Sequence, residues 1–283
     1  MLPIVAVLVA LQAPAADGPS KPVAPQTAPA AGAEYKVVFG YYELKKEPIA
    51  AGELVAGRGK LYQFLEGSAE VIVIDPARRS ITILDLRRQA MAVVGFAEVE
   101  EGVAAIRKEM RESIAELEKK GTRADRVAAD IERDQLETRF RATYDEPEHR
   151  LRLANACIQV ESVGEPEPDE ARLVGLGKAL VLLTELRAIR AADSLAPFAK
   201  VEAIEAMVAG RKLRPTEMTF VFRLAGPPKK YRWTYKLTPT ITDREREALA
   251  RIDDLLGRTR RLDLDRYDRL LEADEIQPRV PKG

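Results

Sequence analysis

The 283-residue sequence has almost no cysteine or histidine, with one residue of each type, Cys157 and His149. A single cysteine excludes an internal disulfide, so an apolar core must stabilise the fold. A single histidine leaves few ways to build a histidine-based triad, a general base or a zinc site. We expect Cys157 to be a buried residue in a strand and His149 to be a solvated loop residue.

The sequence has no excess of charge of either sign, because 45 basic residues balance 45 acidic residues. Proteins that bind nucleic acid usually carry a basic excess or a basic stripe. Here the charges alternate along the predicted helix faces, which is typical of solvated surfaces. We therefore predict no nucleic-acid partner.

Long apolar runs are also missing, apart from ten uncharged residues at Leu2–Leu11. This run is too short to cross a bilayer as a helix. The small residues Ala13, Ala15 and Ala16 follow it, which favours a signal peptide over residues 1–16, although no basic residue precedes the run. A buried N-terminal strand is the alternative. We predict export to the periplasm or the cell exterior, with no membrane span in the mature chain.

Composition divides the rest of the chain into three parts. Residues 17–33 are rich in proline and alanine and predict a disordered linker. Residues 34–272 contain the periodic apolar patterns and predict a single α+β domain. Residues 273–283 predict a flexible tail.

Alternating apolar residues indicate several strands. Residues 71–74 are apolar on both faces, which is typical of an interior strand. Asp75 and Pro76 then favour a turn, so that Ile74 pairs with Ile81 and Ile72 with Ile83. This turn explains Asp75 better than a catalytic role does. Further along, a change of parity at 154–156 indicates a bulge within one strand.

Apolar stripes with helical spacing predict the helices. The clearest covers Ala97–Lys120, and we expect its stripe to pack on the sheet. Other stripes follow at 123–136, 173–189 and 198–208, and a capping box at Thr242 starts another helix. The fold class is therefore α+β, with a curved antiparallel sheet of about seven to nine strands, a meander plus hairpins, covered by four or five helices.

The last predicted hairpin carries the candidate binding residues. Folding it about Pro227–Pro228 pairs Phe220 with Tyr235 and Phe222 with Trp233, which places one aromatic face on the sheet. This face lines a ligand cavity or packs on helices as core, and none of its own residues is an ionised group that would indicate a binding site. The candidate ligand-binding residues are Phe220, Phe222, Tyr231, Trp233 and Tyr235.

Other motifs are incomplete. The glycines at 52–59 break the chain and lack the Lys-Ser/Thr pair of a phosphate loop. The segment 174–180 fails in the same way, and its glycines favour close helix packing. The segments 145–149 and 263–268 resemble metal-binding loops but lack the required ligand pattern. Nothing selects a pair of carboxylates, so we predict no catalytic residue, no metal site and no cofactor.

Two segments resemble known exported proteins. Glu70–Leu86 and Tyr231–Tyr235 resemble strands of the periplasmic lipoprotein-carrier family, whose curved sheet wraps over helices. Residues 197–220 are similar to uncharacterised exported proteins of planctomycete-type bacteria. The long helix after the meander and the helical pair at 170–209 depart from the carrier family. The carrier resemblance implies an apolar groove for an acyl chain or a lipoprotein, and the second resemblance implies no activity.

These observations predict an exported, soluble, non-enzymatic protein of the bacterial envelope. It would bind an apolar small molecule, a lipid or an envelope protein on the concave face of the sheet. One alternative is a hydrolase that uses paired carboxylates. The other is a structural or scaffolding protein of the envelope.

Overall fold

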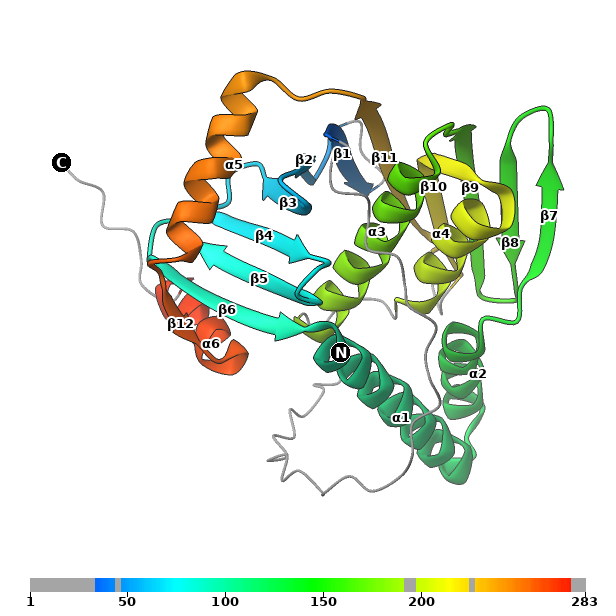
Figure 1. Cartoon of the computed structure of the whole chain (residues 1–283). Helices are drawn as coiled ribbons and strands as arrows, with labels where there is room; N and C mark the ends of the chain where they lie inside the picture. The colour runs from blue at the N-terminus through cyan, green and yellow to red at the C-terminus, as the bar shows by residue number, and fades with distance from the viewer. Residues whose placement is uncertain (1–33, 44–46, 191–196, 224–226, 276–283) are drawn as a thin grey trace, which may run out of the picture.

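A computed structural model describes residues 34–43, 47–190, 197–223 and 227–275. Within them the chain forms one unclosed sheet of twelve strands together with six helices (Figure 1). Every pair of neighbouring strands is antiparallel except β6 and β12, which run parallel. The α+β class and the curved antiparallel sheet are confirmed, with more strands and one more helix than we predicted.

The strand order across the sheet is β12-β6-β5-β4-β3-β2-β1-β11-β10-β9-β8-β7. The strands are β1 Tyr35–Glu43, β2 Ala50–Gly57, β3 Lys60–Leu65, β4 Glu70–Asp75, β5 Ser80–Asp85, β6 Ala90–Gly95, β7 Arg141–Asp145, β8 Arg150–Ala154, β9 Ile158–Pro166, β10 Leu213–Phe222, β11 Lys229–Thr238 and β12 Arg260–Leu262. The helices are α1 Phe96–Lys120, α2 Arg123–Glu137, α3 Glu170–Arg190, α4 Phe198–Arg211, α5 Asp243–Leu256 and α6 Leu264–Glu275.

The strands β1 to β6 form a meander, of which the part from β4 to β6 was predicted. Ile72 pairs with Ile83 and Ile74 with Ile81, as predicted. The Asp75 carboxylate accepts a hydrogen bond from the backbone N–H of Arg78 at 3.0 Å. Asp75 is therefore a turn residue, because its side chain satisfies the backbone where the chain reverses.

The centre of the meander is buried on both faces. Ile72 and Ile74 face the main core, which also contains residues of α3, α4 and α6. Val71 and Val73 face a second core, which includes Leu249 of α5. This arrangement confirms the prediction of an interior strand, and it places α5 on the face opposite α3 and α4.

The apolar stripe of α1 does not pack on the sheet as we expected. Only Val99 at its start belongs to the main core. Val103 and Ile114 instead pack in a separate cluster with α2 and with Phe198 of α4. The reason is that α1 follows β6 directly and runs away from the sheet (Figure 1).

Two hairpins differ from the prediction. The segment 154–156, which we predicted to be a bulge within one strand, is instead part of a turn between β8 and β9. In this turn the Asn155 Oδ1 accepts a hydrogen bond from the backbone N–H of Ile158 at 2.7 Å. In the last hairpin, Phe220 pairs with Tyr231 rather than Tyr235. The shift covers an even number of residues, so the same side chains remain on the same face. Both prolines precede β11, where a missing N–H removes no ladder bond.

The strands β2 and β12 were not predicted. Gly52 lies inside β2. A glycine is needed at this position because an added Cβ would stand 2.1 Å from the Phe64 carbonyl oxygen. Arg58 and Gly59 have positive φ values of 55° and 74° and form the two-residue turn between β2 and β3. The glycine-rich segment is therefore a strand and a hairpin turn.

The helices α3 and α4 lie against each other on the same face of the sheet (Figure 1). A Cβ added at Gly177 would stand 2.8 Å from Val208 Cγ1, which confirms that this glycine permits close helix packing. None of the helices in the described ranges has the length and apolar character that a bilayer span requires. The predicted signal peptide (1–16) and linker (17–33) lie outside the described residues, and α6 continues to Glu275, past the predicted domain end at 272.

Candidate functional site

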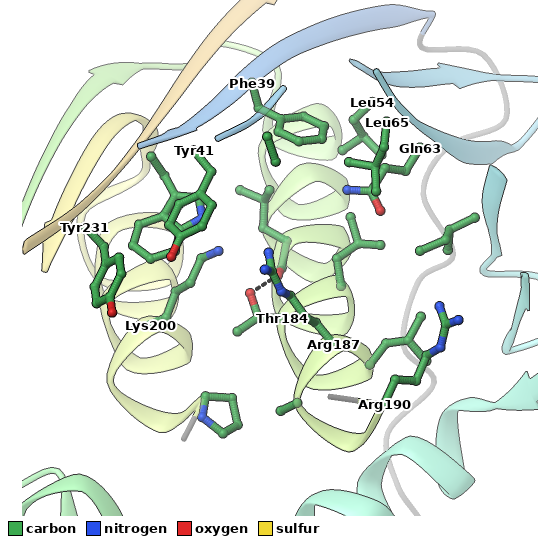
Figure 2. Close-up of a pocket in the computed structure, with 18 of the residues that line it drawn as sticks. Phe39, Tyr41, Leu54, Gln63, Leu65, Thr184, Arg187, Arg190, Lys200 and Tyr231 are labelled. Carbon is green, nitrogen blue, oxygen red and sulfur yellow. Dashed lines mark hydrogen bonds between the residues drawn. The ribbon is translucent and has the colours of Figure 1, made fainter. Parts of the chain in front are cut away.

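A cavity of about 660 Å³ lies between the sheet and the helices α3 and α4 (Figure 2). The cavity is bounded by β1 to β4 and the β10–β11 hairpin on the sheet side, and by α3, α4 and α6 on the other. Its lining is mainly apolar and includes Val37, Phe39, Ala50, Leu54, Leu65, Ile72, Leu180, Leu183, Leu186, Ala188, Pro197 and Ala199. The volume is within the range of small-molecule pockets, about 300–1,000 Å³.

The structure brings together all five residues that the sequence analysis selected, and each of them lines this cavity. They are Phe220, Phe222, Tyr231, Trp233 and Tyr235. The Phe220 ring meets Trp233 edge-on at 5.0 Å between ring centroids, and Phe222 meets Tyr231 in the same way at 5.9 Å. Their role in ligand binding stays a prediction, but their position on a cavity surface is now established.

Tyr41 of β1 extends this aromatic group. It is the direct cross-strand partner of Trp233, and the two rings stack with centroids 4.6 Å apart. The Tyr231 ring also stacks on the Tyr41 ring, with centroids 5.9 Å apart. Strand alternation puts Tyr41 on the same face of β1 as Val37 and Phe39, but nothing local indicates that β1 pairs with β11.

Lys200 of α4 brings a charged group to the aromatic face from outside the hairpin. Its Nζ lies 4.5 Å from the centroid of the Trp233 ring (Figure 2). Its side chain is partly accessible, lines the cavity and makes no ion pair with any described residue. Burial, with the positive charge of Arg187 as a second cause, lowers the pKa of the Lys200 ammonium from 10.5 to about 7.

Arg187 of α3 is the second cation near the aromatic group. Its guanidinium carbon lies 5.5 Å from the centroid of the Tyr41 ring. Arg187 lines the cavity and is also exposed, so the cavity opens to solvent beside it. No carboxylate in the described part of the chain forms an ion pair with it. Thr184, one turn earlier, donates its hydroxyl hydrogen to the Leu180 carbonyl oxygen at 2.7 Å.

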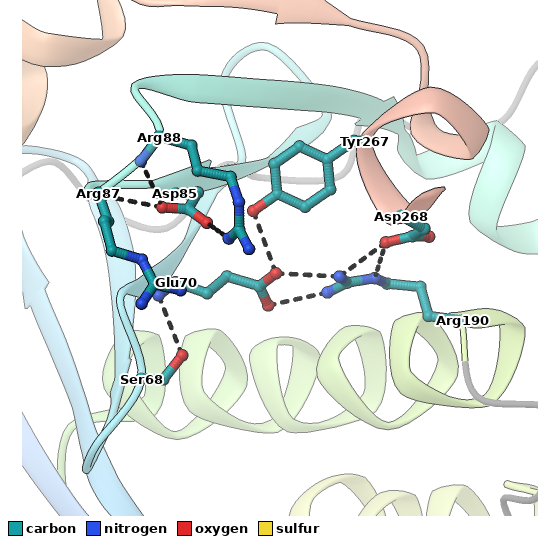
Figure 3. Close-up of polar contacts among 8 residues, drawn as sticks. All are labelled: Ser68, Glu70, Asp85, Arg87, Arg88, Arg190, Tyr267 and Asp268. Carbon is teal, nitrogen blue, oxygen red and sulfur yellow. Dashed lines mark hydrogen bonds and ion pairs between the residues drawn. The ribbon is translucent and has the colours of Figure 1, made fainter. Parts of the chain in front are cut away.

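Arg190 at the end of α3 is bound quite differently (Figure 3). Its two terminal nitrogens donate to the two oxygens of Glu70 at 2.8 and 2.9 Å, and Nη2 also donates to Asp268 at 2.9 Å. The hydroxyl of the buried Tyr267 donates to Glu70 at 3.2 Å. These bonds join β4, α3 and α6, and they neutralise both carboxylates that line the cavity.

Beside this cluster, Asp85 is nearly fully buried, with 2% of its surface exposed. Its Oδ1 accepts the backbone N–H groups of Arg87 and Arg88 at 2.8 Å each, and its Oδ2 pairs with the Arg88 guanidinium (Figure 3). Burial alone would raise the pKa of Asp85, but the bonds from Arg88 and Arg87 lower it. Asp85 therefore fixes the turn between β5 and β6.

The remaining candidate residues lie elsewhere. His149 stands in the turn between β7 and β8, where its Nδ1 is 3.3 Å from the Tyr144 hydroxyl. Burial and the neighbouring Asp134 raise the pKa of the partly buried Cys157 to about 11, so its thiol is not activated. Asp263 caps α6 by accepting the Arg266 N–H. The described residues contain no group of histidine, cysteine and acidic side chains that could hold a metal ion.

Comparisons with known proteins identify no family for this chain. No protein-family model matches the sequence, and a search of curated proteins gave no match. The functional argument therefore depends on the cavity and its charges.

Sequence reasoning missed Lys200 and Arg187 because both lie on helices. The helices were predicted from the spacing of their apolar residues alone. A basic residue such as Lys200, which stands between Phe198 and Val201, therefore received no weight. The available signal was Lys200 itself. It lies beside an apolar stripe, and no acidic residue stands one helical turn away from it on the same face. That signal is weak without knowledge of which strands the helix covers.

Proposed function

We propose that the protein binds an apolar small molecule or a lipid in the cavity between the sheet and the helices α3 and α4. The observation that carries the proposal is an apolar cavity of about 660 Å³ beside four aromatic rings. A concave, mainly apolar pocket of this size with a few polar groups at its edge is typical of small-molecule binding sites.

Binding would gain free energy from the apolar surface that the ligand removes from water, at about 25 cal/mol per Å². Aromatic rings add rigid contact area at low cost in side-chain entropy. The sheet holds these rings in place, since Tyr41 and Trp233 are paired residues of adjacent strands. The site is thus largely formed before the ligand arrives.

The predicted export is part of this proposal, because residues 1–16 have the pattern of a signal peptide. A role in the bacterial envelope would follow from it. N-terminal sequencing of the mature chain, with cleavage expected after Ala15 or Ala16, tests this part independently of the cavity.

The alternative of a hydrolase with paired carboxylates has less support at this site. Glu70 and Asp268 both line the cavity, but both are bonded to Arg190. A general acid or base needs a carboxylate that is free to exchange a proton with the substrate. The cavity offers no such group among the described residues.

The test measures binding of a neutral apolar dye, N-phenylnaphthylamine, to the delipidated full-length chain. It compares the unchanged protein with a variant in which a larger side chain fills the cavity. Leu183 lines the cavity and is partly buried, so Leu183→Trp should weaken dye binding about tenfold or more. Val174 lies on the same helix but is exposed and away from the cavity, so Val174→Trp is the matched control and should bind like the unchanged protein.

Absence of dye binding to the unchanged protein would contradict the proposal, and so would equal binding by the two tryptophan variants. Organic extraction of the purified protein followed by mass spectrometry gives a second readout. A bound apolar molecule that is lost in Leu183→Trp and kept in Val174→Trp supports the cavity as its site.

A further inference from the structure

We infer that the ligand is an amphiphile with one anionic group, and that this group is held between Lys200 and Arg187 while the apolar part fills the rest of the cavity. This inference rests on the proposed function and adds the chemistry of the ligand. Its basis is an imbalance of charge. Among the described residues, three basic side chains and two acidic side chains line the cavity, and both acidic ones are bound to Arg190.

The two remaining cations lie beside one pair of stacked rings. Lys200 Nζ is 4.5 Å from the centroid of Trp233, and the Arg187 guanidinium carbon is 5.5 Å from the centroid of Tyr41. These rings stack at 4.6 Å, and the positive charge of Arg187 acts on Lys200, so the two cations lie close enough to interact. Contact with an aromatic face attracts a cation but leaves its N–H groups free to donate.

Among the described residues, the groups around Lys200 include no acidic side chain that pairs with it. Tyr41 and Tyr231 face it from β1 and β11, and burial raises the pKa of both phenols, so both stay neutral at physiological pH. Arg187 faces it from α3 and is itself positive. Burial, together with the negative charges of Glu100 and Glu205, raises the pKa of Glu185 on α3, and Arg107 opposes this effect.

A partly buried ammonium that has no counter-ion among the described residues is costly, and the cost falls when a ligand supplies the negative charge. A carboxylate can accept from the ammonium and from the guanidinium at once, and charge-assisted bonds of this kind are shorter and stronger than neutral ones. The apolar walls formed by Leu54, Leu65 and Leu183 then suit an alkyl chain.

The experiment compares two ligands that differ only in the head group, dodecanoate and dodecanol, by calorimetry on the delipidated full-length chain at about pH 6. We expect dodecanoate to bind about tenfold or more tightly than dodecanol. Lys200→Met keeps the length of the side chain and removes its charge, so it should abolish the preference. Lys200→Arg should retain it.

The matched control is Lys178→Met, because Lys178 is exposed on α3 and does not line the cavity. This variant should keep the full preference for dodecanoate. If the unchanged protein binds both ligands equally, the inference is wrong and the proposed function stands. If it binds neither ligand nor the neutral dye, the proposed function itself fails. A preference that survives in both Lys200→Met and Arg187→Met would place the anion elsewhere and overturn the inference.

Discussion

The basic side chains in two parts of the cavity wall differ in whether they are paired with carboxylates. Arg190 is bonded to two carboxylates and supports a buried tyrosine hydroxyl through Glu70. Lys200 of α4 and Arg187 of α3 lie beside aromatic rings and form no ion pair with any described residue. The comparison separates a cation that holds the fold together from cations that the fold leaves available to a ligand.

The first part is built for stability. The guanidinium of Arg190 binds Glu70 through two parallel hydrogen bonds, an arrangement that fixes both groups in one geometry. Only 16% of the Arg190 side chain and 15% of the Glu70 side chain are exposed. Removal of one partner therefore leaves the other charge buried without compensation.

The largest expected effect is that of Arg190→Met, which breaks this part. We expect it to lower the free energy of unfolding by about 3 kcal/mol, measured by urea denaturation. The control is Arg258→Met, because Arg258 and its partner Asp254 are 72% and 76% exposed. That variant should change the stability by less than about 0.5 kcal/mol. Equal effects of the two variants would show that Arg190 has no special structural role.

A second change adds a carboxylate to the part of the cavity wall that contains Lys200 and Arg187. Thr184 stands three residues before Arg187 on α3 and lines the cavity, so Thr184→Glu places a negative charge beside Arg187. We expect the affinity for dodecanoate to fall about tenfold, with dodecanol affected far less. Thr184→Gln, which has the same size without the charge, should keep the preference for dodecanoate. An unchanged preference in Thr184→Glu would argue against an anion site at this position.

The smallest expected effect concerns the stability cost of Lys200. The folded-state pKa of about 7 lies below the usual 10.5, so the cost is fully present below pH 7 and disappears as the pH rises from 7 to 10.5. Lys200→Met should therefore stabilise the protein by about 1 kcal/mol at pH 6, and the gain should shrink toward pH 10. A gain that is independent of pH, in thermal melts at both values, would mean that Lys200 is not desolvated.

The comparison also shows which features a sequence can reveal. The aromatic residues of the last hairpin were found because strand alternation is a local pattern, and an even shift of register left them on the same face. The turn at Asp75 and the pairing of Ile74 with Ile81 were also predicted from neighbouring residues alone.

Features that depend on long-range pairing could not be predicted. Tyr41 joins the aromatic group only because β1 pairs with β11, and Arg190 meets Glu70 only when the end of α3 reaches the start of β4. The stripe of α1 was assigned to the wrong partner, because an amphipathic pattern indicates an apolar face without indicating what covers it.

The pairing of β1 with β11 has a consequence for how the molecule is assembled during synthesis. The first six strands emerge early and are neighbours in sequence, so they form contacts of short range. Until residues 229–238 are made, β1 is an open edge with unsatisfied backbone groups, and the cavity has no Trp233 wall. The cavity is therefore complete only when the two halves of the sheet are joined through β1 and β11.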